Sequence, residues 1–201
     1  MKQEMLILFG NGSHYSIAVL KQLLEREIVP VAVVLPHYPP ATISEPVNLK
    51  VDVEEPANDF IGIAKHLSIP VIYAPRALKS RLAEKLAPFK ADYFLVACWP
   101  YLLPLETVDL AAGVALNLHP SLLPEYSGAT PVFDQINRNE SRLGVTLHLL
   151  SQEYDCGEIV AQASFQLESG TAVSEKIEAK AALLGTGLLV KFIRDNHVHR
   201  S

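Results

Sequence analysis

The sequence contains little cysteine and no long uninterrupted apolar run. With only two cysteines, Cys98 and Cys156, a disulfide framework is not expected, and a reducing compartment such as the cytoplasm is the simplest location. A membrane-spanning helix needs about 18 consecutive apolar residues, and no segment here reaches that length. The first apolar run, residues 5–9, is also too short for a signal peptide. We therefore expect a cytoplasmic protein that does not enter a membrane.

Basic residues are outnumbered by acidic ones. The 17 Lys+Arg and 22 Asp+Glu give a formal net charge of −5, which is the wrong sign for a protein that binds nucleic acid by neutralising many phosphates. Only a local basic patch stays open. Internal repeats and low-complexity tracts are also lacking. With 201 residues, 49% of them hydrophobic, the chain can bury one substantial core, and we expect a single domain over residues 1–201.

Short apolar runs alternate with segments of helical spacing along the chain. The predicted strands are residues 5–9, 28–35, 70–73, 92–97, 113–118, 145–150 and 158–165. The predicted helices begin near residue 16 and residue 131 and cover residues 58–66, 78–86 and 173–195, while residues 37–56 are expected to be a loop. This alternation indicates an α/β fold with a mostly parallel sheet and helices on both faces. The two late strands are expected to form an antiparallel pair.

Two polar side chains lie at the end of one predicted strand. Asn117 and His119 are two residues apart, so they share one side of an extended segment. Ligands of open α/β sheets bind beyond such strand ends. Asp155 follows in the connection between the late strands, and a carboxylate beside a histidine favours the imidazolium and orients its ring. The three residues suit attack on a carbonyl group, although a strand end with a structural histidine would show the same pattern.

These residues lie within longer motifs that resemble a known family. The segments NLHPSLLPEYSG (residues 117–128) and GVTLHLLSQEYDCGEIVAQ (residues 144–162) resemble the catalytic core of the folate-dependent formyltransferases. This family includes methionyl-tRNA, glycinamide ribonucleotide and sugar-nucleotide formyltransferases. Asn-x-His, Ser-Leu-Leu-Pro, a glycine, Gly-Val-Thr and Asp-x-Gly occur in the same order, and ACWPYLLP (residues 97–104) looks like the family's folate-pocket segment.

The resemblance implies a Rossmann-like domain that uses 10-formyltetrahydrofolate as co-substrate and needs no metal. Asn117 and His119 would polarise the formyl oxygen and stabilise the oxyanion, and Asp155 would hold His119 protonated and position a water molecule. The folate would be lined by Pro100, Tyr101, Leu102, Leu103, Ser121, Leu122, Leu123, Pro124, Gln152, Glu153 and Tyr154. Trp99 and Tyr101 could pack on the folate ring or be core aromatics, and His148 is expected to be a structural histidine.

A glycine-rich turn precedes the first predicted helix. Gly10, Asn11, Gly12 and Ser13 resemble the loop that binds the acceptor's phosphate in the glycinamide ribonucleotide enzymes, and backbone N–H groups at a helix start can bind phosphate. Turns of this kind also form for steric reasons alone. His197 and His199 lack accompanying ligands at metal-binding spacing, so we expect a frayed tail there and no metal site.

The identity of the formylated amine is predicted from what differs from the family. The tRNA enzymes carry a basic insertion after the second strand and a separate C-terminal domain, whereas residues 37–55 here contain one lysine and four acidic residues and the chain ends with its closing helix. Residues 125–127 are Glu-Tyr-Ser where those enzymes tend to have arginines. We expect a small amine acceptor, such as an amino sugar on a nucleotide. The alternatives are methionyl-tRNA, glycinamide ribonucleotide, hydrolysis of formyltetrahydrofolate, and a non-catalytic folate-binding module.

Overall fold

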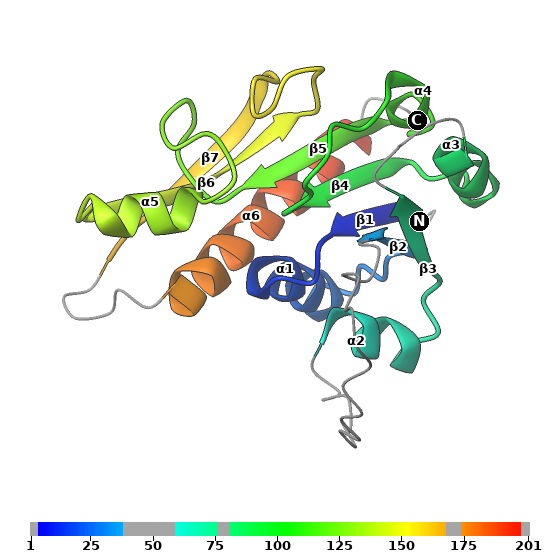
Figure 1. Ribbon diagram of the computed structural model, residues 1–201, viewed down its shortest axis with the longest axis horizontal. Coiled ribbons are helices and arrows are strands. Elements are labelled where there is room, and N and C mark those ends of the chain that lie inside the picture. Colours follow the sequence, from blue (N-terminus) through cyan, green and yellow to red (C-terminus); the bar gives the residue numbers. More distant parts are fainter. Residues whose placement is uncertain (1–3, 38–58, 76–80, 168–173, 198–201) are drawn as a thin grey trace, which may run out of the picture.

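A seven-stranded sheet forms the centre of the protein, with the strand order β3-β2-β1-β4-β5-β6-β7 (Figure 1). The computed structural model describes residues 4–37, 59–75, 81–167 and 174–197. The strands are β1 (Leu6–Gly10), β2 (Ala32–His37), β3 (Val71–Pro75), β4 (Tyr93–Ala97), β5 (Val114–His119), β6 (Arg142–Leu149) and β7 (Ile159–Gln166). The helices are α1 (His14–Glu25), α2 (Phe60–His66), α3 (Arg81–Leu86), α4 (Leu105–Val108), α5 (Pro131–Asn137) and α6 (Ser174–His197), with a 3-10 turn η1 (Ala87–Phe89).

The first five strands are parallel and the last two are antiparallel to their neighbours. Parallel pairs join β3 to β2, β2 to β1, β1 to β4 and β4 to β5, whereas β6 runs antiparallel to both β5 and β7. The predicted mostly parallel, Rossmann-like sheet with a late antiparallel pair is therefore confirmed. The antiparallel pairing of β5 with β6, which the strand spacing did not predict, places Asn117 opposite His148.

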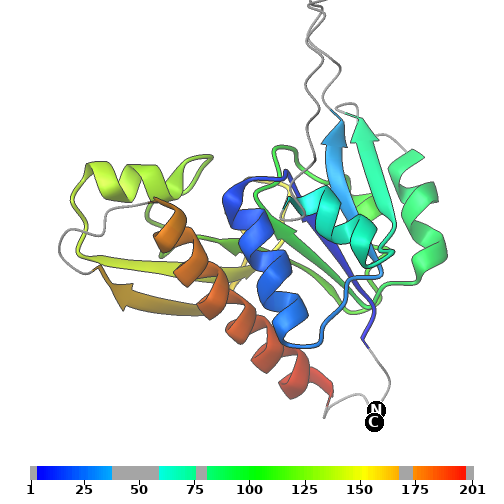
Figure 2. The ribbon, with the colours of Figure 1, turned by 90° about the horizontal axis from the view of Figure 1, so that it is seen from below.

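Helices cover both faces of the sheet, as expected from its buried strands. Alternate residues of β1 divide between the two sides: Leu6 and Leu8 pack in one cluster with α1, α2 and α6, while Ile7 and Phe9 pack in a second cluster with α3. Figure 2 shows α1 and α6 side by side across the first of these faces. The core therefore lies in two layers, one on each side of the central strands.

The turn between β1 and α1 has a clear local cause. A Cβ atom at Gly10 would lie 2.9 Å from the Ser16 Cβ and 3.0 Å from the Phe60 ring, and Gly12 has a φ of 81°, which glycine adopts without strain. Ser13 caps the helix, because its hydroxyl accepts a hydrogen bond from the Ser16 backbone N–H at 3.4 Å. The helix consequently begins at His14, before the apolar pattern that predicted it.

Element boundaries differ from the sequence prediction at several places. β2 begins at Ala32 and not at residue 28, because Ile28 still belongs to the turn after α1, where its N–H donates to the Leu23 carbonyl. The short elements η1 and α4 were not predicted, since a single turn carries no periodicity. The loop expected over residues 37–56 falls almost wholly outside the described residues, as do residues 78–80 at the start of the helix predicted over 78–86.

The closing helix α6 approaches β5 and β6 closely. At Gly185, an added Cβ would lie 2.9 Å from Leu118 Cδ2 and 3.0 Å from Val145 Cγ2, so the missing side chain permits the contact. Leu118 is the buried residue between Asn117 and His119. The helix therefore supports, from behind, the strand that carries two of the predicted site residues.

Of the helices in the described ranges, none combines the length and the apolar character needed to cross a bilayer.

Candidate active site

A cavity of about 410 Å³ lies at the carboxyl ends of β1, β4 and β5, which is where open α/β sheets bind ligands. It is lined by residues 11, 96, 98–103, 108, 117–120, 128–129, 131, 148, 150–151 and 153–155. Three of the segments directly follow or end parallel strands. The other residues come from α4, from the first residue of α5 and the loop before it, from β6, and from the connection between β6 and β7. The topology thus brings residues far apart in the sequence to one edge of the sheet.

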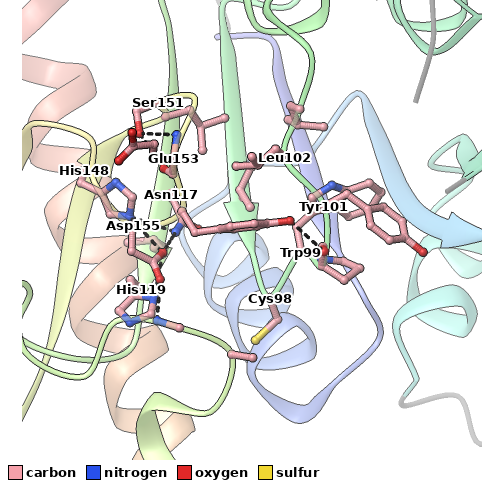
Figure 3. A pocket seen from close by; sticks show the side chains of 18 of the residues that line it. Cys98, Trp99, Tyr101, Leu102, Asn117, His119, His148, Ser151, Glu153 and Asp155 are labelled. Atoms are coloured by element: carbon pink, nitrogen blue, oxygen red, sulfur yellow. Dashed lines mark hydrogen bonds and ion pairs between the residues drawn. The ribbon is translucent and has the colours of Figure 1, made fainter. Parts of the chain in front are cut away.

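The three residues predicted to be catalytic meet in this cavity. The Asp155 Oδ1 atom lies 3.3 Å from His119 Nδ1 and 3.4 Å from Asn117 Nδ2. Asn117 and His119 project from the same side of β5, and Asp155 comes from the opposite loop (Figure 3). The period of two along the strand therefore places the pair as expected. Trp99 and Tyr101 lie across the cavity from this group (Figure 3).

Asp155 is held in place on both of its carboxylate oxygens. Oδ2 accepts a hydrogen bond from the Gly128 N–H at 2.8 Å, and the backbone of Asp155 has a φ of 56°, an uncommon conformation that turns the side chain back toward β5. Burial by itself raises the pKa of the carboxyl, but the hydrogen bond and charge of His119, the Gly128 N–H and His148 outweigh it and hold the pKa below its usual range. The group is therefore an ionised carboxylate at neutral pH.

Both ring nitrogens of His119 face oxygen atoms that can only accept. Nε2 lies 2.8 Å from the Tyr126 carbonyl oxygen, and Nδ1 faces the Asp155 carboxylate. A ring that carries hydrogen on both nitrogens satisfies both contacts at once. The residue is 5% exposed, and these two oxygen atoms are the partners of its ring.

His148 is a site residue that the sequence did not identify as one. Its Nδ1 lies 2.8 Å from the Leu149 carbonyl oxygen, so this nitrogen carries the hydrogen, and Nε2 is left to accept from Asn117 Nδ2 at 3.0 Å. Burial lowers the pKa of His148, and the charge of His119 adds to this, while the Leu149 carbonyl and Asp155 act in the opposite direction. His148 is therefore neutral, and it fixes the orientation of the Asn117 carboxamide. Only the register between β5 and β6, which no sequence motif gives, could have revealed this.

The residues predicted to line a folate site divide into two groups. Pro100, Tyr101, Leu102, Leu103, Glu153 and Tyr154 line the cavity. Gln152 does not, and lies in a neighbouring groove of about 460 Å³ that shares part of its wall with the cavity. Trp99 lines the cavity and also packs edge-on against Phe9 of the core at 5.5 Å, and its contact with a folate ring stays a prediction.

Ser121, Leu122, Leu123 and Pro124, which were also predicted to line a folate site, do not line this cavity. After Pro120 the chain turns toward β6. There the Thr146 hydroxyl donates to the Ser121 carbonyl at 2.7 Å and accepts from the Leu123 N–H at 3.0 Å. These residues therefore build the support behind the strand end. Ser121 also donates its hydroxyl to the Glu125 carbonyl at 2.9 Å, which shapes the loop that leads to Tyr126.

Of the glycine-rich turn, only Asn11 reaches the cavity. Its Oδ1 accepts from the Ser13 N–H at 2.9 Å, while Gly10 is buried and Ser13 caps α1. His14 beside the turn pairs with Glu175 at 3.1 Å. Burial raises the pKa of nearby Glu178, with His14 lowering it and Glu175 raising it further. Two carboxyl groups, those of Glu175 and Glu178, thus lie near the start of α1.

Within the described part of the chain, no group of three or more His, Cys, Asp and Glu side chains is arranged to hold a metal ion. The tail predicted at His197 and His199 falls where the structure describes no side chains. Cys98 lines the cavity. Burial raises the pKa of its thiol, the charge of Glu178 raises it further, and a hydrogen bond with Ser13 acts in the opposite direction. Cys156 is exposed.

Comparisons with known proteins agree with this geometry. A family model described as "Formyl transferase" matches residues 4–193. The methionyl-tRNA formyltransferase of Helicobacter acinonychis is 30% identical over 193 residues, covering 96% of this chain and 61% of that protein. The chain therefore spans about three fifths of the length of this curated relative.

Two solved structures share the fold. The phosphoribosylglycinamide formyltransferase of Streptococcus pneumoniae superposes with a TM-score of 0.70 at 20% identity, covering 94% of this chain and 98% of that one. A formyltetrahydrofolate deformylase from Pseudomonas syringae gives a TM-score of 0.66 at 17% identity, covering 92% of this chain and 60% of that one. At these identities the likeness concerns the architecture.

Proposed function

Because the chain belongs to the formyl transferase family, we propose that it transfers the formyl group of 10-formyltetrahydrofolate to the nitrogen of an amine. The observation that carries this proposal is the meeting of Asn117, His119 and Asp155 in one cavity, with Asp155 Oδ1 3.3 Å from His119 and 3.4 Å from Asn117. We place the reaction in the cytoplasm, where a chain with two cysteines needs no disulfide.

The proposed reaction begins with attack of the neutral amine on the formyl carbon. As the carbon–nitrogen bond forms, negative charge develops on the formyl oxygen, and preorganised donors stabilise it. The Asn117 carboxamide would supply one such donor, and the His119 imidazolium, whose two N–H groups face Tyr126 and Asp155, would supply positive charge beside it. Among the contacts of Asn117, the one to Asp155 at 3.4 Å is longer than the one to His148 at 3.0 Å, so the formyl oxygen would displace Asp155 from the carboxamide.

Proton transfer completes the proposed reaction. The attacking nitrogen must lose a proton and the N10 nitrogen of the folate must gain one before its bond to the formyl carbon breaks and tetrahydrofolate leaves. The Asp155 carboxylate, ionised at neutral pH, balances the charge of His119 and can hold a water molecule that carries this proton. Neutral His148 keeps the Asn117 amide group turned toward the formyl oxygen.

The folate would occupy the apolar end of the cavity. Pro100, Leu102 and Leu103 follow β4 on this side, and Trp99 and Tyr101 add aromatic surface. A flat bicyclic ring buries its faces well against such a wall, while backbone groups of the segment supply hydrogen bonds to its edge.

For the acceptor we propose a small amine with hydroxyl groups, such as an amino sugar. The charge around the site supports this choice. No Lys or Arg stands among the described residues that line the cavity, and Glu175 and Glu178 lie near the start of α1. A phosphate next to the reacting amine would meet carboxylates, whereas hydroxyl groups could donate to them. If the acceptor is a sugar nucleotide, its phosphates should lie away from the glycine-rich turn between β1 and α1.

Methionyl-tRNA is the second candidate acceptor, because the relative with 30% identity over 193 residues is a methionyl-tRNA formyltransferase. Binding of tRNA would depend steeply on salt, since phosphate contacts release counterions. The net charge of −5 makes this the less favoured acceptor.

The test measures tetrahydrofolate release from 10-formyltetrahydrofolate, with separate amino-sugar nucleotides, glycinamide ribonucleotide and methionyl-tRNA as acceptors. We expect release that requires one small amine, with the formylated amine identified by mass spectrometry. Release without any amine would indicate a hydrolase, and turnover with methionyl-tRNA alone would replace the proposed acceptor. Binding of the folate without turnover of any acceptor would indicate a binding module.

A further inference from the structure

Tyr154 belongs to two hollows of the surface at once. Its side chain lines the cavity beside Asp155 and also the neighbouring groove of about 460 Å³. The two hollows share three further residues, Tyr101, Leu102 and Leu103, all from the segment after β4. Tyr154 is the shared residue that comes from the opposite side, the connection between β6 and β7.

The hydroxyl of Tyr154 reaches across this space. It donates to the Pro100 carbonyl oxygen at 3.4 Å, so the aromatic ring spans from the loop that carries Asp155 to the segment that follows β4. The side chain is 56% exposed. One part of the side chain therefore faces solvent while another forms a wall of both hollows, so the ring lies between the cavity and the groove.

The backbone on either side of Tyr154 is held. The Ser151 hydroxyl donates to the Glu153 carbonyl at 2.6 Å, and the Glu153 N–H donates back to that hydroxyl at 3.3 Å. On the other side, the Asp155 carboxylate is bound by the Gly128 N–H and by His119. With the loop fixed at both flanks, the available movement is rotation of the Tyr154 side chain, and its exposure means that an outward turn loses little buried surface.

We propose that Tyr154 is a latch that closes the cavity on its ligand, so that a folate enters and leaves only when the ring turns outward and its bond to Pro100 breaks. A ligand with a flat ring in the cavity and an extended part in the groove must pass the Tyr154 ring. The inference rests on the proposed function in taking the ligand to be a folate. Tyr154 acts as a positioning residue and takes no part in bond making.

The kinetics of ligand binding test the latch, and the chain contains its own reporter. Trp99 is the single tryptophan of the sequence and lines the cavity. Stopped-flow fluorescence with 5-formyltetrahydrofolate as the probe gives association and dissociation rates for the intact chain, Tyr154→Phe and Tyr154→Ala. Tyr73→Phe, which removes the hydroxyl of a half-exposed tyrosine outside both hollows, is the matched control.

We expect Tyr154→Phe to raise the association and dissociation rates together, each by about threefold to tenfold, the effect of one lost hydrogen bond. The equilibrium affinity should change by less than either rate, because the latch closes both the free and the bound protein. Tyr154→Ala should associate at least as fast and dissociate faster still. Unchanged rates in Tyr154→Phe, or slower association in Tyr154→Ala, would overturn the latch.

A second measurement needs no folate. Acrylamide quenching of Trp99 in the protein alone should increase in Tyr154→Phe and further in Tyr154→Ala, while Tyr73→Phe stays at the parent value. Equal quenching in all four proteins would contradict the latch whatever the ligand is. If the parent protein fails to bind the probe but its quenching follows the expected order, then the proposed function is wrong and the latch stands.

Discussion

At the scale of single residues, Asn117, His119, His148 and Asp155 form one connected network of hydrogen bonds and ion pairs. His119 donates to Tyr126 and Asp155, and Asn117 donates to His148 and Asp155. Removing one member therefore leaves a buried group unpaired as well as removing a role in the reaction. Such networks are sensitive to each of their members.

The proposed roles of Asn117 and His119 predict that Asn117→Ala and His119→Ala each lower turnover by about two orders of magnitude or more, on the scale of one lost oxyanion donor or acid–base group. Steady-state release of tetrahydrofolate is the measurement. His66→Ala, at the exposed end of α2, serves as the control and should keep the parent rate. Near-parent turnover in either site variant would refute the mechanism.

The lowered pKa of Asp155 predicts a stability that depends on pH. Since the folded-state pKa is depressed, the carboxylate stabilises the protein above its unfolded value of about 3.9, and this contribution disappears as the pH falls through the lower folded value. Asp155→Asn should therefore be less stable than the parent at pH 7, with the difference shrinking in strong acid. Urea unfolding at several pH values measures this, and a difference that is constant with pH would contradict the assignment.

His148 predicts a second pH effect in a different window. Its folded-state pKa is lowered, so the unfolded chain takes up a proton first and stability falls as the pH drops below the unfolded value of about 6.5. His148→Asn should remove this part of the pH dependence. Unfolding free energies of the two proteins between about pH 7 and pH 5 should diverge in slope, and parallel curves would show that His148 is not buried in its neutral form.

What the sequence could predict at this scale depended on spacing. Asn117, His119 and Asp155 were found because two of them alternate on one strand and the third lies in a recognisable motif. Ser121 supports the end of β5, and His148 accepts a hydrogen bond from Asn117. Both roles depend on contacts between β6 and the region of β5, and these contacts require a register between strands that are distant along the chain. Neither could be derived from local patterns.

At the scale of elements, β5 serves two purposes through its two faces. Leu116 and Leu118 are buried in the core that α6 covers, while Asn117 and His119 face the cavity.

Element types followed from periodicity at nearly every predicted position, because apolar runs and helical spacing are local signals. The boundaries shifted where a cap such as Ser13 or a turn such as that at Ile28, and not hydrophobicity, decides them.

Two glycines of α6 allow a matched test of its contact with β5. A Cβ at Gly187 meets nothing within 4 Å, so Gly187→Ala should stabilise the protein by about 1 kcal/mol, the helix-propensity difference. Gly185→Ala gains the same propensity but presses on Leu118 and Val145, and should show no gain. Because Leu118 lies between Asn117 and His119, Gly185→Ala should also lower turnover. Thermal unfolding and turnover decide, and equal behaviour of the two variants would contradict the packing argument.

At the scale of the whole molecule, one continuous sheet joins all seven strands, and the expected single domain predicts one cooperative unfolding transition. Trp99 fluorescence reports the contact of β1 with the segment that follows β4, and far-UV circular dichroism reports every element. We expect the two denaturation curves to coincide, as two-state unfolding requires. Separate midpoints would show that the antiparallel end of the sheet unfolds on its own.

The double use of β5 has a consequence for engineering this protein toward new acceptors. Substitution on one face of the strand removes a reacting group, and substitution on the other opens a hole beneath it, so random libraries over residues 114–119 should consist almost entirely of inactive variants. Asn11 and Ala129 line the same cavity from loops, where a changed side chain alters the shape offered to an incoming amine and leaves the core intact. Selection for altered specificity should therefore draw its successful variants from the loops and return β5 unchanged.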